Sequence, residues 1–124
     1  MSQEQAGIAI LDRRIERAAL ARLLTAYFGD MVKLVVDVER GVVAVGGELH
    51  ADAKQLLLSA GSRQADLWGA NSYPGRGRDA CIEFTALINI RPAQGNRSML
   101  IQDPGIREKI RALVSAFVGE GEAI

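Results

Sequence analysis

The sequence is poor in cysteine and aromatic residues and has no long apolar run. Cys81 is the only cysteine of the 124 residues, so the chain cannot form an internal disulfide bond. Aromatic residues make up 5%, which argues against the interleaved aromatic and basic pattern of single-strand nucleic-acid binders. No apolar run approaches the roughly 20 residues of a membrane-spanning helix, and residues 1–5 lack the basic and apolar regions of a signal peptide. We therefore expect a cytoplasmic protein without a membrane segment.

The chain also lacks an excess of charge of either sign. Fifteen Lys+Arg balance fifteen Asp+Glu, which argues against nucleic acid or an anionic membrane as the main partner. The hydrophobic share of 48% and the charged share of 24% are typical of a water-soluble globular domain. We expect one domain over residues 1–124, with an ordered core over about 7–118 and a frayed tail over 119–124.

The spacing of apolar residues predicts alternating strands and helices. The expected strands span 7–11, 31–38, 42–45, 66–73, 80–90 and 98–102, and the expected helices span 15–28, 50–60 and 104–118. Asp103 followed by Pro104 is a typical helix start, with a capping side chain before the first helical position. The order β-α-β-β-α-β-β-β-α predicts the α+β class: a single two-layer domain with a largely antiparallel sheet packed against three helices.

Three stretches of the chain stand out as longer motifs. They read GGELHAD at 46–52, DLWGANSYP at 66–74 and LINIRPAQGNRSM at 87–99. Together they resemble an uncharacterised family of small prokaryotic proteins that is catalogued only as a domain of unknown function. The resemblance extends over residues 8–118 and implies a free-standing bacterial or archaeal domain. It implies no activity, because that family has no assigned chemistry.

The strongest candidate for a binding site is the segment from Arg91 to Ser98. Guanidinium groups bind phosphate or carboxylate through paired hydrogen bonds, and the N–H groups near a glycine can add to an anion site. The spacing matches no phosphate-binding fingerprint, and the alternative is a hairpin loop whose polar groups bind its own backbone. The candidate ligand-binding residues of this segment are Arg91, Gln94, Asn96, Arg97 and Ser98.

A second candidate lies in the expected strand 66–73. Gly69 leaves room for a ligand to approach the backbone, so Trp68 could stack on a ligand and Asn71 could hydrogen-bond it. The alternative is that Trp68 is a core side chain and that Asn71 binds a neighbouring turn.

The third candidate surrounds His50, the only histidine. In an extended segment Glu48, His50 and Asp52 would share a face, because side chains alternate along a strand. His50 could then act as a general base that Asp52 or Glu48 orients. The alternative is a helix start at which His50 and Asp52 cap free N–H groups. A lone histidine is a poor basis for zinc binding, and we expect no metal site. Cys81 is expected to be a buried structural thiol.

These observations favour a small cytoplasmic binding or regulatory module that recognises an anionic group, phosphate or carboxylate, through the 91–98 loop. Trp68 and Asn71 would line the same pocket. One alternative is a small hydrolase-type enzyme that uses His50 with Asp52 or Glu48, and another is a domain that binds only a protein partner. The first interpretation makes the protein a non-enzyme, either a monomer or a homodimer, and no cofactor is indicated by the sequence.

Overall fold

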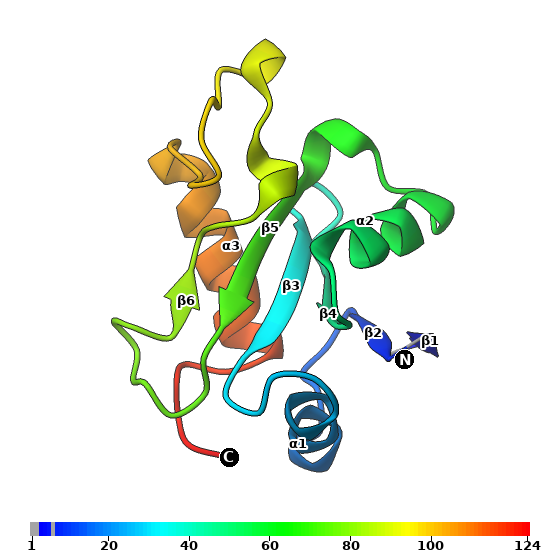
Figure 1. Cartoon of the computed structure of the whole chain (residues 1–124), viewed down its shortest axis with the longest axis vertical. Coiled ribbons are helices and arrows are strands. Elements are labelled where there is room, and N and C mark those ends of the chain that lie inside the picture. Colours follow the sequence, from blue (N-terminus) through cyan, green and yellow to red (C-terminus); the bar gives the residue numbers. More distant parts are fainter. Residues whose placement is uncertain (1–2, 6) are drawn as a thin grey trace.

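The computed structural model describes residues 3–5 and 7–124. Figure 1 shows a twisted sheet with helices around it. The strands are β1 (Gln3–Gln5), β2 (Ile8–Leu11), β3 (Val32–Asp37), β4 (Val42–Gly46), β5 (Leu67–Ser72) and β6 (Ile82–Glu83). The α-helices are α1 (Arg17–Ala26), α2 (His50–Ser59) and α3 (Pro104–Phe117), and the 3-10 turns are η1 (Gln64–Asp66), η2 (Leu87–Asn89) and η3 (Pro92–Gln94).

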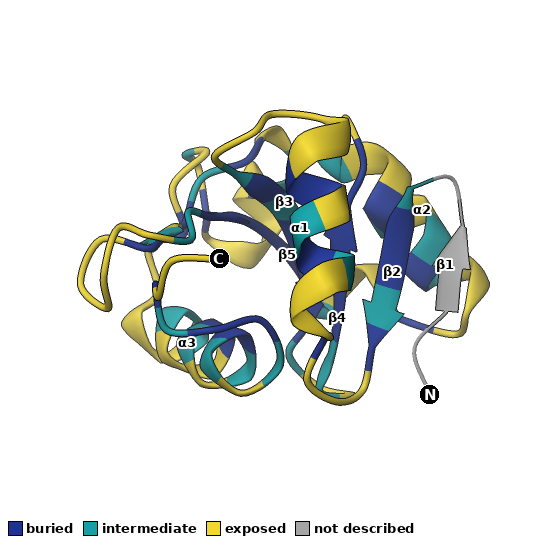
Figure 2. Cartoon of the chain, turned by 90° about the horizontal axis from the view of Figure 1, so that it is seen from below, coloured by how far each residue is buried: buried dark blue, intermediate teal, exposed yellow. Residues whose placement is uncertain are grey.

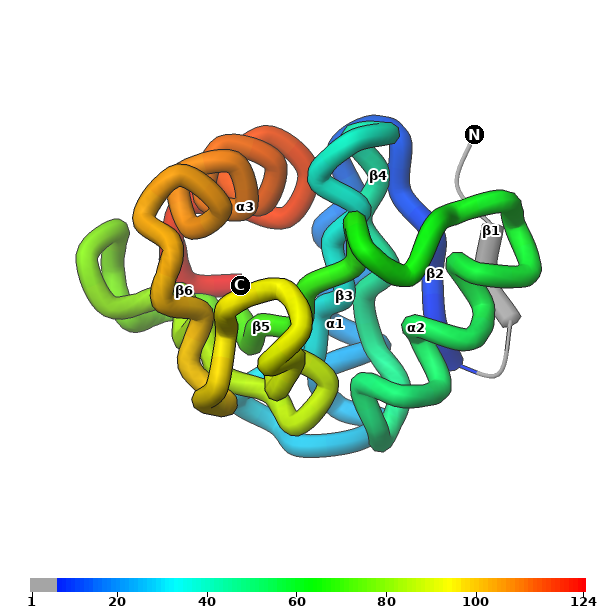
Figure 3. The backbone as a smooth tube through the Cα atoms, turned by 90° about the horizontal axis from the view of Figure 1, so that it is seen from above, coloured from blue at the N-terminus to red at the C-terminus, as the bar shows by residue number. Residues whose placement is uncertain are grey.

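The sheet is antiparallel throughout, in the order β1-β2-β4-β3-β5-β6. The predicted α+β class is therefore confirmed, and the expected neighbouring strands 31–38 and 42–45 form an antiparallel hairpin as β3 and β4. The expected two-layer arrangement is wrong, because helices cover both faces. Residues of α1 and α3 pack on one side of the strands, whereas Ala53 and Leu57 of α2 pack on the other. Figure 3 shows α2 and α3 on opposite sides of the sheet.

Apolar and polar residues alternate little along residues 32–38 because β3 is a central strand of the sheet. Val32, Leu34 and Val36 face α1 and α3, and Val35 faces α2, so both faces of the strand are buried. A strand buried on both faces is apolar at nearly every position. Figure 2 shows this buried interior running through the middle strands, with exposed residues on the outer surfaces of the helices.

The expected strands 80–90 and 98–102 are largely wrong. β6 has only two residues, and beyond it the pairing continues through a single bridge between Thr85 and Leu100. The reason is Asn89, which is fully buried. Its side-chain amide accepts a hydrogen bond from the Gly69 N–H at 2.8 Å and donates one to the Gly69 carbonyl at 2.9 Å. These are the two bonds that a neighbouring strand would make to β5, so the amide replaces a strand residue.

Gly69 has no side chain because this turn approaches β5 closely. A Cβ atom at Gly69 would lie 2.5 Å from the Cβ of Ala86 and 3.1 Å from a side-chain carbon of Ile88. The space that the sequence offered to a ligand is thus filled by the chain itself.

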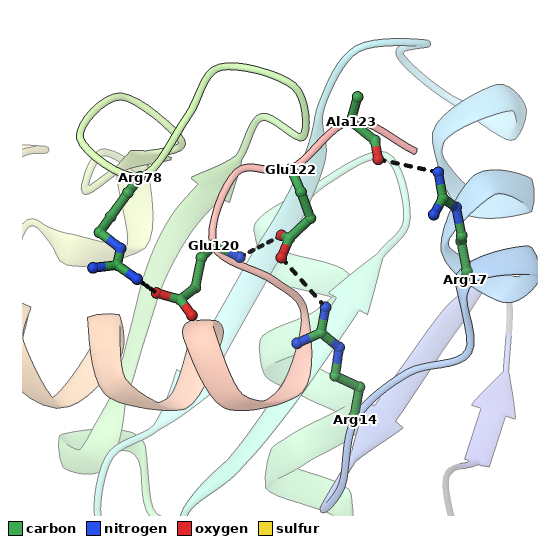
Figure 4. Close-up of polar contacts among 6 residues, drawn as sticks. All are labelled: Arg14, Arg17, Arg78, Glu120, Glu122 and Ala123. Atoms are coloured by element: carbon green, nitrogen blue, oxygen red, sulfur yellow. Dashed lines mark hydrogen bonds and ion pairs between the residues drawn. The ribbon is translucent and has the colours of Figure 1, made fainter.

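The segment 119–124, which we call the strap, packs against the body of the protein and does not fray as expected. The carbonyl of Gly121 accepts hydrogen bonds from the N–H groups of Gly75 and Gly77, each at 3.0 Å. Charged contacts hold the strap further along (Figure 4): Arg78 to Glu120 at 2.6 Å, Arg14 to Glu122 at 3.8 Å, and Arg17 to the carbonyl of Ala123 at 3.2 Å. A sequence of small and acidic residues carries no periodic signal for such docking.

Replacing Gly121 by Ala is expected to release the strap. Gly121 has a φ of 85°, and a Cβ there would lie 2.4 Å from the carbonyl oxygen of Gly77. Gly95 has a similar φ of 81° and open space around it, so Gly95→Ala is a matched control. We expect the control to cost about 1 kcal/mol for the left-handed backbone and to keep the strap docked. Hydrogen exchange at the amides of Gly75 and Gly77 should accelerate in Gly121→Ala only; equal protection in both variants would contradict this account.

Candidate functional site

Arg91, the first residue of the predicted anion-binding loop, has a structural role. Only 8% of it is exposed. Its Nε donates to the carbonyl of Ile88, and its Nη1 and Nη2 donate to the carbonyls of Gln64 and Leu67. The guanidinium also stacks over the ring of Trp68, 4.4 Å from its centre, and burial lowers the pKa of Arg91. Backbone carbonyls thus occupy donors of Arg91 that the predicted contact with a ligand would need.

Asn96 has a structural role of the same kind, with 4% of it exposed. Its Nδ2 donates to the carbonyls of Asn89 and Ser98, each at 2.8 Å, and its Oδ1 accepts from the N–H of Gln102 at 2.9 Å. The other polar residues of the loop are Gln94, bonded to Arg91 and the Ala65 carbonyl, Ser98, bonded to the Leu100 N–H, and the exposed Arg97. An anion site on this loop would rest on Arg97.

A hollow does lie beside the loop, but the charge on its wall is negative. Trp68, Gln94 and Asn96 line it, together with Asp103. Asp103 caps α3 by accepting from the N–H groups of Gly105 and Ile106. A carboxylate in the wall repels an anion, so this hollow does not favour the predicted ligand.

Arg91 and Arg97 should therefore respond differently to truncation. Arg91→Ala would leave three carbonyls without their donors, and we expect a loss of about 3 kcal/mol in the free energy of unfolding. Arg97→Ala should change it by less than about 0.5 kcal/mol. Urea unfolding of the two variants measures both values. A small loss in Arg91→Ala would show that its hydrogen bonds do not hold the loop.

The side chain of His50 contacts β5 and has no hydrogen bond or ion pair with Glu48 or Asp52, the acidic residues near it in sequence. Its Nε2 lies 2.9 Å from the carbonyl of Ala70. Because a carbonyl only accepts, Nε2 carries the proton. Glu48 and Asp52 instead line a separate hollow together with Ile8 of β2, Tyr27 and other residues of α2. The predicted grouping of His50 with Asp52 and Glu48 is wrong because the chain is already helical at His50, which separates their directions.

Asn71 lies in a polar row across the sheet beneath His50. Its register partners are Lys33 on β3 and Glu83 on β6. Its Nδ2 donates to Glu83 Oε1 at 2.7 Å, and the Tyr73 hydroxyl donates to the same oxygen at 3.2 Å. Trp68 faces the opposite side of β5, in the core with α1 and α3. Trp68 and Asn71 therefore do not line one pocket, because they stand an odd number of residues apart on a strand.

Stability should depend on the protonation of His50. Burial, more than any other influence, lowers its pKa below the ordinary value of 6.5. The folded protein then holds a neutral imidazole where the unfolded chain binds a proton, so this contribution to stability is present above pH 6.5 and is lost as the pH falls toward the folded pKa. His50→Gln, which keeps a donor for Ala70, should lack this loss. Unfolding free energies between about pH 5 and 8 test the difference; parallel curves would refute it.

A separate cavity of about 100 Å³ lies beneath the strap. Arg14 and Arg17 contribute its charged wall, and Ser72, at the end of β5, contributes a hydroxyl. Ser72 is 4% exposed. Among the residues that the structure describes, the buried side-chain atom without a hydrogen-bond partner is Asn71 Oδ1, on the neighbouring residue of β5. The remaining wall is largely apolar and includes Ile15, Leu20, Pro74 and Val118.

Sequence patterns do not select these residues. Arg14 and Arg17 lie at the start of the expected helix 15–28, outside the three motifs, and Ser72 lies in the expected strand 66–73. They meet because β5 ends beside the start of α1 and because the strap folds back over both. Residues from three distant parts of the chain thus form the cavity.

Comparison with known proteins places the chain in a family. A family model described as a protein of unknown function (DUF5674) matches residues 9–117. The chain belongs to this family. The match agrees with the resemblance that the three sequence motifs indicated, and it ends just before the strap. No curated protein and no solved structure matches the chain.

Two kinds of feature are absent from residues 3–5 and 7–124. No group of three or more His, Cys, Asp or Glu side chains is placed to hold a metal ion. No helix in this part of the chain has the length and hydropathy needed to cross a bilayer. Cys81 is buried as expected, and burial raises the pKa of its thiol.

Proposed function

We propose that this protein is a small binding module that recognises an anionic group in the cavity beneath the strap. The observation that supports this function best is the meeting of Arg14, Arg17 and Ser72 at one cavity. The charged side chains in its wall are the guanidinium groups of Arg14 and Arg17 and the carboxylate of Glu122. With its single buried thiol the chain suits a reducing compartment, and we place the module in the cytoplasm of a prokaryotic cell.

Arginine suits such a site for physical reasons. Its charge persists at any physiological pH, and its planar N–H groups bind carboxylate or phosphate oxygens in pairs. Arg14 and Arg17 are exposed on one side and reach the cavity on the other. They are therefore hydrated enough to avoid the cost of a buried charge, yet an anion between them would be partly removed from water, where the attraction is stronger.

The proposed ligand is an anion, as the sequence predicts, but the proposed site is the cavity beneath the strap and not the 91–98 loop. At the 91–98 loop the structure uses Arg91 and Asn96 for internal hydrogen bonds. At the strap, Arg14 has one contact, at 3.8 Å, with an exposed carboxylate. An exposed ion pair of this kind contributes about 0–1 kcal/mol, so an external anion can compete with it.

The test is thermal unfolding in the presence of inorganic phosphate and small carboxylates, each compared with chloride at equal ionic strength. A ligand at about 100 times its dissociation constant adds roughly 2.7 kcal/mol of stability, which raises the midpoint by about 10 °C in a domain of this size. We expect the shift in the wild type and its loss in Arg14→Gln/Arg17→Gln.

The matched control is Arg13→Gln/Arg22→Gln, which removes two exposed arginines that do not line the cavity. This double variant should keep the full shift. If Arg97→Ala abolishes the shift while Arg14→Gln/Arg17→Gln retains it, the anion binds at the 91–98 loop and the strap site is wrong. No shift with any anion would refute the proposed function.

A further inference from the structure

We infer that the ligand of the strap cavity is a short-chain monocarboxylate, with its alkyl chain inside the cavity and its carboxylate between Arg14 and Arg17. This inference rests on the proposed function, because it specifies which anion the same site binds. Three observations support it: the volume of the cavity, the chemistry of its wall, and a carboxylate of the protein itself at its mouth.

The volume limits the ligand to a few atoms. The cavity measures about 100 Å³, whereas a cavity of about 150 Å³ accommodates benzene. About four carbon atoms therefore fit. Nucleotides and other metabolites of their size need pockets of roughly 300 Å³ or more, so they are excluded as ligands enclosed by the strap.

The wall distinguishes a carboxylate with an alkyl chain from a bare anion. Ile15, Leu20 and Val118 form an apolar part that gains from contact with carbon and offers nothing to phosphate oxygens. Ser72, Arg14 and Arg17 supply the polar part. A ligand with one charged end and one apolar end matches both parts. Phosphate has no apolar group, so the apolar part of the wall would stay exposed to water.

The protein already holds a carboxylate at this position. Glu122 lines the cavity; its Oε1 accepts from the N–H of Glu120 at 2.6 Å, and its Oε2 lies 3.8 Å from Arg14 Nη2 (Figure 4). Backbone hydrogen bonds from Glu122 itself and from Glu120 lower the pKa of this carboxyl, which keeps it ionised. A glutamate side chain is a carboxylate on two methylene groups, so Glu122 has the chemistry of the inferred ligand and competes with it.

The experiment uses isothermal titration calorimetry with butyrate on the full chain, with butyramide and inorganic phosphate as comparison ligands. We expect saturable binding of butyrate and none of butyramide, which has the same shape without the charge. Backbone NMR shifts induced by butyrate should centre on Ile15, Ser72 and the strap.

Two variants at exposed or small positions test the site without threatening the fold. Glu122→Gln removes the competing carboxylate and should strengthen butyrate binding by about two- to fivefold, the value of an exposed ion pair. Ser72→Ala removes a hydroxyl from a residue that lines the cavity and should weaken binding by roughly fivefold. Far-ultraviolet circular dichroism and the unliganded melting midpoint verify that both variants are folded.

The outcomes separate the inference from the proposed function. Binding of phosphate but not of butyrate, lost in Arg14→Gln/Arg17→Gln, would leave an anion-binding module and overturn the monocarboxylate. Equal binding of butyrate and butyramide would also overturn it, because the arginines would then contribute nothing. If no anion binds, both fail together. Butyrate binding that is unchanged in Glu122→Gln and Ser72→Ala would place the ligand elsewhere and refute the inference.

Discussion

The structure depends on how the outer edge of β5 is completed. β3 pairs with β5 along its whole length, but β6 pairs with it only at Asn71 and Ser72. The rest of that edge would leave buried backbone groups without partners, which costs as much as a lost hydrogen bond for each group. Asn89 and Arg91 supply those partners from side chains, at Gly69 and Leu67. Polar residues that look functional in sequence are thus required to complete the sheet.

The same arrangement positions the cavity. Asn89 and Arg91 complete one end of β5, and Ser72 lies at its other end. There Tyr73 continues the pairing through its N–H to the Cys81 carbonyl, and the following turn offers the N–H groups of Gly75 and Gly77 to the strap. The strap binds to this turn through these hydrogen bonds, and strap residues line the cavity together with Ser72. Hydrogen bonds therefore connect the loop that carries Asn89 and Arg91, strand β5, the turn and the strap.

Much of the fold was predictable because periodicity records burial. The apolar stripe of the last helix, the run 32–38 and the hairpin that follows all have patterns that a single segment determines. The pairing of 80–90 was not predictable, since nothing in a local window shows that Asn89 will replace a strand residue. The strap was missed for a related reason: Gly121 matters through a contact with Gly77, which lies far away in sequence.

The site was hard to predict because the same types of polar residue serve both to bind ligands and to hold the chain's own backbone. A buried arginine that binds carbonyls and one that binds a ligand have the same letter in the sequence, and here Arg91 is the first kind. What distinguishes the second kind is a donor in contact with a cavity and without strong internal partners. Arg14 meets that condition, with a single exposed contact at 3.8 Å. Whether a residue meets this condition depends on its neighbours in the folded structure, many of which are distant in sequence, so the sequence alone does not reveal it.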